Sequence, residues 1–379
     1  MTPLELAPPP TIDDAIAACR TRIDSIDTDL LALIVKRVEC ATEIGRLKRR
    51  GGLPVYHPAR ERAIVANLCA RARGALRDDH VASIWGALFT ASRELQGAPS
   101  VAFLGPAGTF TEAAARQYFG DAVRTDARDT LDGVFTALSQ GETDFAVVPI
   151  ENSTEGTVTR TVDLLAHHAP PITGEIEQTV VHCLLSAGGS LEGVDCVLGH
   201  EQALAQCRTW LDTHAPHLQR IAVSSNGAAA RQAAEQAHCA AIAGEPAALR
   251  YQLLIVARAI QDDPNNRTRF LVLGGPSPEP TGDDRTSLSF TPNDGTDELA
   301  HLFGVLAQRQ IGMLWLAVRP GRAPGSPYRY FADLSGHAHD ARVRAALDDL
   351  APALSGLRVL GAYPRGRLND AACAPSPGH

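Results

Sequence analysis

The sequence contains no uninterrupted apolar run of the roughly 18 residues that a membrane-spanning helix needs, so we expect no such helix. Residues 1–14 have neither a basic head nor an apolar signal core, and we expect no export and a cytoplasmic location. The eight cysteines form no CxxC pair and show no metal-ligand spacing. We therefore expect free thiols in a reducing compartment, no metal site and no cofactor.

Lysine is nearly absent, because only two of the 35 basic side chains are lysines, Lys36 and Lys48. In a chain so biased toward arginine, a lysine indicates a position that needs a compact point charge. Residues 1–97 carry 14 basic and 12 acidic side chains, a net charge of +2, whereas the remainder carries 21 and 31, a net charge of −10. This excess of acid argues against a nucleic-acid partner and leaves small anions as ligands of the first part.

The first 97 residues have the pattern of helices. Residues 12–50 predict one long helix with an apolar seam whose steps alternate between four and three, the spacing that packs against another helix. The seam consists of Ile12, Ile16, Cys19, Ile23, Ile26, Leu30 and Leu33. Two further helices fit residues 58–73 and 78–97, so we expect an all-helical domain over 1–97.

Beyond residue 100, short apolar runs alternate with helical stretches, which predicts an α/β domain over 100–275 with parallel strands covered on both faces. The expected strands are 101–105, 145–150, 180–186, 196–199, 221–224, 239–244 and 270–274, and the expected helices include 111–119, 130–140, 201–213 and 227–237. Residues 274–284 have a linker composition. The order βαββαβ then predicts a ferredoxin-like domain over 285–366.

The helical region carries the phrases ACRTRIDSIDTDLLALIVKR, EIGRLK, PVYHPARE and SRELQ. Their order resembles the all-helical chorismate mutases that are fused to prephenate dehydratases, and the resemblance covers the whole first domain. It implies a substrate pocket lined by Arg20, Arg37, Lys48, Arg60, Glu61, Ser92 and Gln96. His57 stands where many relatives have an acidic residue, so charge at this position would vary near neutral pH.

These residue types suit a Claisen rearrangement, which requires two clamped substrate carboxylates and a donor beside the ether oxygen. Arginines fit the carboxylates, Lys48 and Gln96 would address the ether oxygen, and Glu61 the ring hydroxyl. Arg20 and Lys48 are 28 residues apart in the sequence, roughly 42 Å along a straight helix. If both serve one pocket, Arg20 must come from a second, antiparallel chain, and we predict a homodimer or larger homo-oligomer with shared pockets.

The second region carries GPAGTFTE (105–112), PIENSTEGTV (149–158) and NRTRFLVL (266–273). The first phrase lacks the spacing of nucleotide-binding loops, which leaves an anion cradle and an ordinary glycine-rich turn as alternatives. Together with GHEQALAQC and SNGAAA, these phrases resemble prephenate dehydratase over about residues 100–275. The resemblance implies two lobes of the type II periplasmic-binding-protein kind, with prephenate in the cleft between them.

To become aromatic, prephenate must lose carbon dioxide and its ring hydroxyl, and the hydroxyl needs proton or hydrogen-bond donation to leave. The resemblance assigns this donation to Thr268, which we expect to polarise the hydroxyl rather than ionise, while Glu151 is the rival proton source. The remaining implied substrate contacts are Thr109, Asn152, Ser153, Ser225, Arg269 and Phe270.

The third region contains YRYFADLSGHAHD and VLGAYP, which resemble an ACT domain, an amino-acid-sensing module. The chain departs from the family's two effector phrases: it reads DEL at 297–299 in place of Gly-Ala-Leu, and AVRP at 317–320 in place of Glu-Ser-Arg-Pro. Leu299 and Arg319 are the expected effector contacts, with phenylalanine as the effector. The alternative is that this domain is structural.

Taken together, these resemblances predict a bifunctional enzyme that converts chorismate into prephenate and prephenate into phenylpyruvate. One alternative is an arogenate dehydratase whose helical domain serves mainly for dimerisation. Another is a non-catalytic solute-binding protein, since the two-lobed fold also holds solutes.

Overall fold

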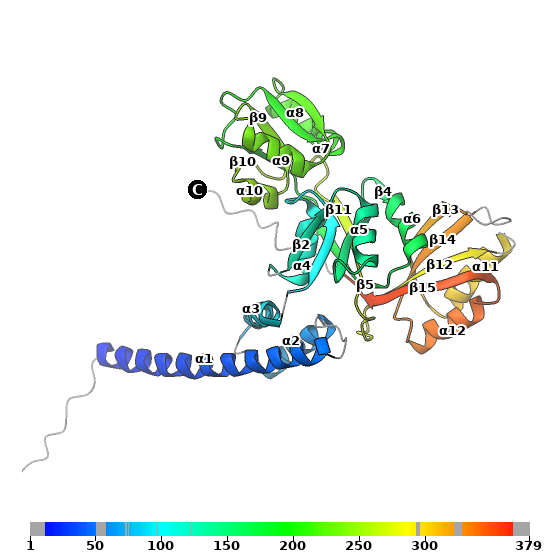
Figure 1. The fold of residues 1–379 in the computed structure, drawn as a ribbon, viewed down its shortest axis with the longest axis horizontal. Coiled ribbons are helices and arrows are strands. Elements are labelled where there is room, and N and C mark those ends of the chain that lie inside the picture. Colours follow the sequence, from blue (N-terminus) through cyan, green and yellow to red (C-terminus); the bar gives the residue numbers. More distant parts are fainter. Residues whose placement is uncertain are drawn as a thin grey trace, which may run out of the picture. The chain divides into compact units, whose positions relative to one another are not determined.

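The computed structural model describes residues 12–50, 58–72, 74, 76–96, 98–121, 123–292, 296–321 and 328–366. They divide into two units (Figure 1): a helical one of residues up to 56 and 61–98, and a larger one from residue 99 onward, with which residues 57–60, at the start of the second helix, are grouped. Over the stretches that the structure describes, none of the helices combines the length and the apolar character that crossing a membrane requires.

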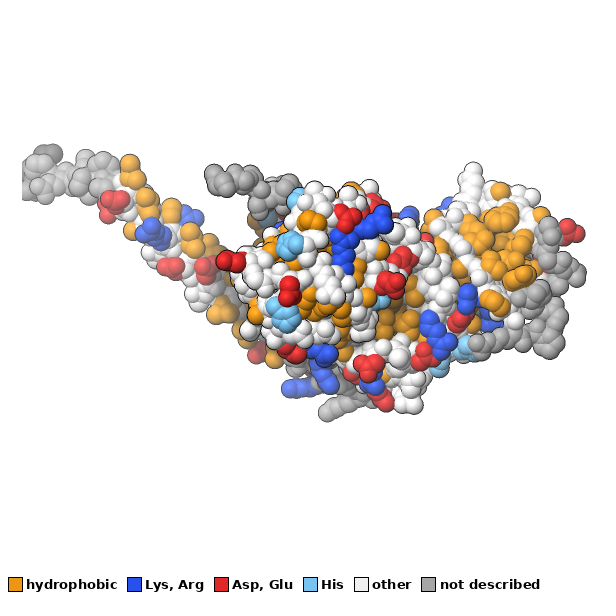
Figure 2. All heavy atoms as spheres, turned by 90° about the horizontal axis from the view of Figure 1, so that it is seen from above, with side chains coloured by type: hydrophobic (Ala, Val, Ile, Leu, Met, Phe, Trp, Pro, Cys, Tyr) orange, Lys and Arg blue, Asp and Glu red, His pale blue; other side chains and the backbone are white. Residues whose placement is uncertain are grey.

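The helical unit consists of α1 (Ile12–Arg50), α2 (Pro58–Ala72) and α3 (Asp78–Gln96), which confirms the predicted helices to within one residue. Acidic residues Asp13 and Asp14 stand in the first turn of α1, where they favour the positive end of the helix dipole. α1 packs against α3, which buries Phe89. The seam side chains of α1 are nevertheless exposed in the single chain, from 45% for Ile16 to 81% for Ile12. Figure 2 shows apolar side chains along this helix, among charged ones.

The first lobe of the larger unit is built on a mixed sheet. Its strand order is β2 (Arg124–Arg128), β1 (Ser100–Leu104), β3 (Phe145–Asn152), β11 (Arg267–Leu273) and β5 (Ile172–Thr179), with β4 (Gly156–Thr157) paired to β3. The helices are α4 (Phe110–Phe119), α5 (Leu131–Ser139) and α6 (Thr159–His168). Val134, Phe135 and Val148 are fully buried between the sheet and its helices. This core holds the strands in place, and with them the polar residues that follow the strand ends.

The second lobe contains a five-stranded sheet. Its order is β10 (Leu254–Ala257), β6 (Cys183–Ser186), β9 (Cys239–Ala243), β7 (Cys196–His200) and β8 (Gln219–Val223). The helices are α7 (Glu201–Gln206), α8 (Arg208–His214), α9 (Asn226–Glu235) and α10 (Glu245–Tyr251). The chain passes between the two sheets twice, from β5 to β6 and from β10 back to β11, so two crossings join the lobes.

The strand directions correct one expectation. β1 is parallel to β2 and β3, and β7 is parallel to β8 and β9, as predicted. β11, however, is antiparallel to both β3 and β5, and β6 is antiparallel to β9 and β10. The expectation of parallel strands was wrong for these two. The chain reaches β11 from the other lobe and therefore runs through the first sheet in the opposite direction.

The last part has the predicted βαββαβ order: β12 (Asp284–Pro292), α11 (Thr296–Gln308), β13 (Met313–Pro320), β14 (Tyr328–Ser335), α12 (Ala341–Leu350) and β15 (Leu354–Pro364). The sheet is antiparallel in the order β13-β14-β12-β15, which confirms the ferredoxin-like fold. β15 packs against β5 of the first lobe, and at Gly361 the backbone of Ile172 leaves no room for a side chain. This domain and the first lobe therefore share a close interface.

Candidate active sites

In the helical unit, Arg37 is held in place by uncharged partners. Its Nη1 donates to Ser92 Oγ at 3.0 Å, and its guanidinium carbon lies 5.0 Å from the centre of the Phe89 ring. The Ser92 hydroxyl in turn donates to the Leu88 carbonyl at 2.7 Å. A hydroxyl and an aromatic face orient the guanidinium without neutralising it, so its charge can serve an anion.

Glu61 has a partner that the sequence analysis missed. Arg93 Nη1 lies 2.8 and 2.6 Å from the two carboxylate oxygens of Glu61, and Arg93 Nη2 donates to Thr90 Oγ1 at 3.0 Å. Because this pair joins α2 to α3, it fixes where the Glu61 carboxylate stands. No sequence pattern indicated that Glu61, directly after Arg60 in α2, pairs with Arg93, directly after Ser92 in α3.

The other expected residues of this pocket are spread along the unit. Lys48 is half-buried near the end of α1, whereas Arg20 is exposed 28 residues earlier on the same unbroken helix. Arg60 is exposed on α2. His57 and the side chain of Gln96 lie outside the described residues.

In the larger unit, two helix N-termini from different lobes lie close together. Thr109 caps α4 by accepting from the Glu112 N–H, and Ser225 caps α9 by accepting from the Ala228 N–H at 3.0 Å. A side chain at Gly227, in the first turn of α9, would lie 3.0 Å from the Ala107 carbonyl oxygen of the loop before α4. Paired N-termini of this kind favour carboxylates, because both helix dipoles present their positive ends.

Thr268 lies on β11 directly opposite Asn152 on β3, and Asn152 Nδ2 donates to Thr268 Oγ1 at 2.9 Å. The next residue, Ser153, exchanges hydrogen bonds with Arg267: its N–H donates to the Arg267 carbonyl and its Oγ accepts from the Arg267 N–H, both at 2.9 Å. The structure thus brings Thr268, Asn152 and Ser153 together, as expected from the motifs.

Arg269, expected to bind substrate, lies instead inside an ion-pair cluster with Arg285, Glu175 and Asp333. Its Nη1 is 2.7 Å from Asp333 Oδ2 and 3.4 Å from Glu175 Oε2, and the side chain is 6% exposed. Arg285 Nη1 and Nε lie 3.0 and 3.1 Å from the same two carboxylates. Neighbouring strand residues point to opposite faces, so Arg269 faces away from Thr268. Arg269 is thus placed among its ion-pair partners and away from Thr268.

The charge of Arg269 is secured by this environment. Burial alone would lower the pKa of Arg269, but the carboxylates of Asp333 and Glu175 outweigh it and raise the pKa. Arg269 Nε also lies 3.2 Å from Glu151 Oε2. Glu151 is therefore engaged on the Arg269 face of the sheet. Phe270, another expected substrate contact, is only 2% exposed and packs in the core.

The two expected effector residues are also occupied by packing. Arg319 on β13 makes a two-pronged ion pair with Asp163 on α6, at 2.7 and 2.8 Å. Leu299 is half-buried against the core of the third domain. Arg319 thus joins the ferredoxin-like domain to the first lobe.

Comparison with known proteins assigns the helical part and the two-lobed part of the chain to families. The family model described as prephenate dehydratase matches residues 101–278, and the model described as chorismate mutase type II matches residues 19–97. The bifunctional chorismate mutase/prephenate dehydratase of Neisseria gonorrhoeae is 40% identical over 357 residues, which cover 93% of this chain and 98% of that protein. The chain belongs to the bifunctional chorismate mutase/prephenate dehydratase family.

One solved structure supports the assignment of the larger unit, and a second shares its fold. The prephenate dehydratase of Arthrobacter aurescens, in complex with L-Phe, is 34% identical with a TM-score of 0.65 and covers 70% of this chain and 90% of its own. GqqA, a quorum-quenching acylase, is 27% identical with a TM-score of 0.65 and covers 70% and 98%.

Like its bifunctional relatives, this enzyme of phenylalanine biosynthesis isomerises chorismate to prephenate and dehydrates prephenate to phenylpyruvate. The alternative of a non-catalytic solute-binding protein is therefore wrong.

One acidic residue of the dehydratase motif was overlooked. Glu155, in the ENSTEG phrase, accepts a hydrogen bond from Gln202 Nε2 of the second lobe, so it lies where the lobes meet. Burial raises the pKa of Glu155, and nearby His200 opposes that rise. Its place three residues after Asn152 was the available signal.

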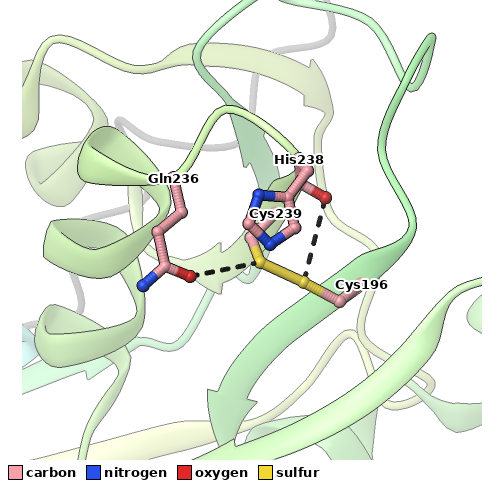
Figure 3. Close-up of a disulfide and its surroundings, with 4 residues drawn as sticks. All are labelled: Cys196, Gln236, His238 and Cys239. Carbon is pink, nitrogen blue, oxygen red and sulfur yellow. Dashed lines mark hydrogen bonds between the residues drawn. A yellow bond between two sulfur atoms is a disulfide. The ribbon is translucent and has the colours of Figure 1, made fainter.

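The second lobe of the dehydratase contains a disulfide between Cys196 and Cys239 (Figure 3). The two residues are register partners on β7 and β9, with Cα atoms 4.8 Å apart, but 43 residues apart in sequence. The expectation of free thiols throughout was wrong for this pair. His238 lies beside it, and the three ligand atoms are within 4.8 Å of one another. Because the two sulfurs are bonded together, they offer no thiolate to a metal ion.

Proposed function

We propose that prephenate is dehydrated where the two lobes meet, with Thr268 donating a hydrogen bond to the leaving ring hydroxyl. The observation that carries this proposal is the bond from Asn152 Nδ2 to Thr268 Oγ1. Thr268 Oγ1 already accepts a hydrogen bond from Asn152, so the Thr268 hydroxyl hydrogen must be donated to a different group. A hydroxyl fixed in this way is a donor in place before the reaction begins.

In the proposed step the ring carboxylate leaves as carbon dioxide, and its bonding electron pair enters the ring. The bond from the ring carbon to the hydroxyl breaks, and the departing oxygen takes up one proton. The products are phenylpyruvate, carbon dioxide and water. Donation by Thr268 stabilises the negative charge that grows on the departing oxygen.

Glu151 is a weaker candidate for the proton source, because its carboxylate is engaged by Arg269 on the opposite face of the sheet. Glu155 is the stronger acidic candidate. It follows the Asn152 loop, contacts the second lobe and has a raised pKa, which keeps a proton available closer to neutral pH. We propose Asn152, Ser153 and the helix ends capped by Thr109 and Ser225 as the surroundings of the substrate's carboxylates.

The decisive test is Thr268→Ala in the full chain, assayed separately with chorismate, prephenate and arogenate. We expect the conversion of prephenate to be lost while the conversion of chorismate continues. Products from arogenate at a higher rate than from prephenate would contradict our substrate assignment. An active Thr268→Ala enzyme would contradict the role of Thr268, and Glu155→Gln would then be the next variant.

We further propose that the mutase pocket is shared between two chains. Arg37 and Lys48 would serve the pocket from one chain and Arg20 from the other, since roughly 42 Å of helix separates Arg20 from Lys48. The exposed apolar seam of α1 supports this arrangement, because a partner helix would cover it. We propose a cytoplasmic homodimer, in line with the biosynthetic role of the family.

Complementation tests the shared pocket. Arg20→Met and Lys48→Met should each abolish mutase activity, but their mixture, refolded together, should regain about a quarter of it, because each mixed dimer contains one intact pocket. No recovery in mixtures that do form mixed dimers would contradict the proposal. Dehydratase activity of the same samples is the control.

Phenylalanine is our proposed effector of the ACT domain, since the relative from Arthrobacter aurescens was solved with L-Phe bound. Arg319 is held by Asp163 and Leu299 by the core, so an effector would have to bind beside them or displace a partner. A phenylalanine titration of dehydratase activity decides this, and a flat response would assign the domain a structural role.

A further inference from the structure

A chain of hydrogen bonds runs from Thr268 to a buried histidine between the lobes. It consists of Asn152, Asn266, Gln206 and His182, and we call it the hydrogen-bond chain. Asn152 Nδ2 lies 2.9 Å from both Thr268 Oγ1 and Asn266 Oδ1. Asn266 Nδ2 lies 3.1 Å from Gln206 Oε1, and His182 Nε2 lies 2.9 Å from the same oxygen. These distances are those of well-formed hydrogen bonds.

The backbone fixes the orientation of the first amide in the chain. The N–H groups of Thr154 and Glu155 donate to Asn152 Oδ1 at 2.9 and 3.2 Å. An atom that accepts from two backbone N–H groups must be the oxygen, so the other terminal atom of Asn152 is the nitrogen. Asn152 therefore donates to Asn266, and Asn266 Oδ1 is an acceptor.

The orientations of Asn266, Gln206 and His182 follow in the same way. Since Oδ1 of Asn266 accepts, its Nδ2 donates to Gln206 Oε1. The Gln206 oxygen has no hydrogen to give, so the proton between it and His182 belongs to His182 Nε2. His182 is 2% exposed, and burial lowers its pKa against the opposing effect of Gln206. The neutral imidazole with its proton on Nε2 is thus the stable form.

The hydrogen-bond chain draws on both lobes and both crossings. Asn152 ends β3 in the first lobe, and Gln206 ends α7 in the second. His182 lies in the crossing from β5 to β6, and Asn266 in the crossing from β10 to β11. Asn266 is as deeply buried as His182, at 2% exposure. The hydroxyl of Thr268 is therefore held by groups that keep their positions only while the lobes are correctly placed.

We propose that His182, Gln206 and Asn266 are positioning residues of the dehydration. They hold the Asn152 amide so that it donates to Thr268, and this directs the Thr268 hydroxyl hydrogen toward the leaving hydroxyl of the substrate. Amide N–H groups keep their protons near neutral pH. The hydrogen-bond chain therefore orients the Thr268 hydroxyl as a donor and conducts no proton. The inference rests on the proposed role of Thr268 as that donor.

Two adjacent asparagines provide a matched test. Asn266→Asp keeps the oxygen that accepts from Asn152 and removes the nitrogen that donates to Gln206, whereas Asn265→Asp makes the same change at an exposed position. We expect Asn266→Asp to lower the dehydratase kcat about 10- to 100-fold with KM for prephenate nearly unchanged. Asn265→Asp should leave both constants unchanged.

Gln206 provides a second, independent pair of variants. Gln206→Leu removes the shared acceptor, while Gln206→Glu retains oxygens that can accept from both Asn266 and His182. We expect the leucine variant to lose kcat as Asn266→Asp does, and the glutamate variant to retain most of it. If Asn266→Asp fails to fold, as seen by circular dichroism, this pair decides alone.

The outcomes test the hydrogen-bond chain separately from the role of Thr268. If Gln206→Leu and Asn266→Asp keep the wild-type kcat while Thr268→Ala is inactive, the hydrogen-bond chain has no positioning role. If Thr268→Ala itself is active, the donor assignment fails first. If kcat stays constant while KM rises, or if Gln206→Glu loses as much as Gln206→Leu, the chain merely supports the lobes, and our inference is overturned.

Discussion

Thr268 and Arg269 are neighbours in one strand, yet their surroundings have opposite chemistry. Thr268 belongs to neutral amides that join the two lobes, whereas Arg269 belongs to buried charges that join the first lobe to the ferredoxin-like domain. Neutral amide groups orient a hydroxyl without ionising it. Buried ion pairs hold domains together, because separating the paired charges costs free energy. A short motif thus combines two tasks, and the strand's alternation keeps them apart.

The largest expected effect comes from removing the Thr268 hydroxyl while keeping its shape. Thr268→Val should lower the dehydratase kcat by about 10³-fold, the range for a lost proton or hydrogen-bond donor, with little change in melting temperature. Thr268→Ser, which keeps the hydroxyl, is the control. Steady-state kinetics and a thermal melt of the same samples measure both. A large stability loss would mean that the Thr268 face is structural too.

On the other face we expect stability, rather than chemistry, to suffer. Asp333→Asn removes the carboxylate between Arg269 and Arg285 and should destabilise the larger unit by about 3 kcal/mol. The corresponding fall in melting temperature is roughly 5 °C for a unit of this size. Differential scanning calorimetry measures it.

The control for that variant is the same substitution in an exposed ion pair. Asp349→Asn breaks the contact with Arg309 and should change stability by less than about 1 kcal/mol. Equal effects of Asp333→Asn and Asp349→Asn would remove the distinction between a buried and a surface pair. A low kcat in Asp333→Asn at full stability would instead mean that the cluster takes part in the reaction.

A smaller effect is expected in the pH dependence of stability, through His182. Burial lowers the pKa of His182 from its ordinary value near 6.5, so below that pH the unfolded chain binds more protons than the folded one. His182 therefore makes the protein less stable as the pH falls from neutral. Melting curves at about pH 7.5 and 5.5 should show a smaller difference for His182→Gln than for the wild type. An unchanged difference would contradict a buried neutral histidine.

Much of the fold followed from the sequence, because helices and central strands carry their periodicity locally. The 39-residue helix α1 was predicted to the residue, and the βαββαβ order of the ferredoxin-like domain was predicted correctly. β2, β4, β5 and β10 were missed. β4 and β10 are very short, β2 (RTDAR) is almost wholly polar, and β5 (ITGEIEQT) interrupts its apolar residues with polar ones. In β5, Glu175 is fully buried because Arg269 and Arg285 surround it, and neither contact is visible in a local pattern.

The candidate site was predictable where a motif supplies all of its members, as for Asn152, Ser153 and Thr268. The ion-pair partners of Arg269 were not predictable, because a motif read as letters does not tell which face of a strand each residue occupies. Gln206 and His182 were not recognised, because their contacts depend on how two crossings and a second lobe come together. The disulfide was hidden for the same reason, since register alone pairs Cys196 with Cys239.

The ion-pair cluster bears on how this enzyme can evolve. Arg285 and Asp333 belong to the ferredoxin-like domain, so deleting that domain would leave Arg269 and Glu175 without two of their partners and expose the apolar face beneath β15. Any lineage that loses the domain therefore also loses interactions that stabilise the first lobe.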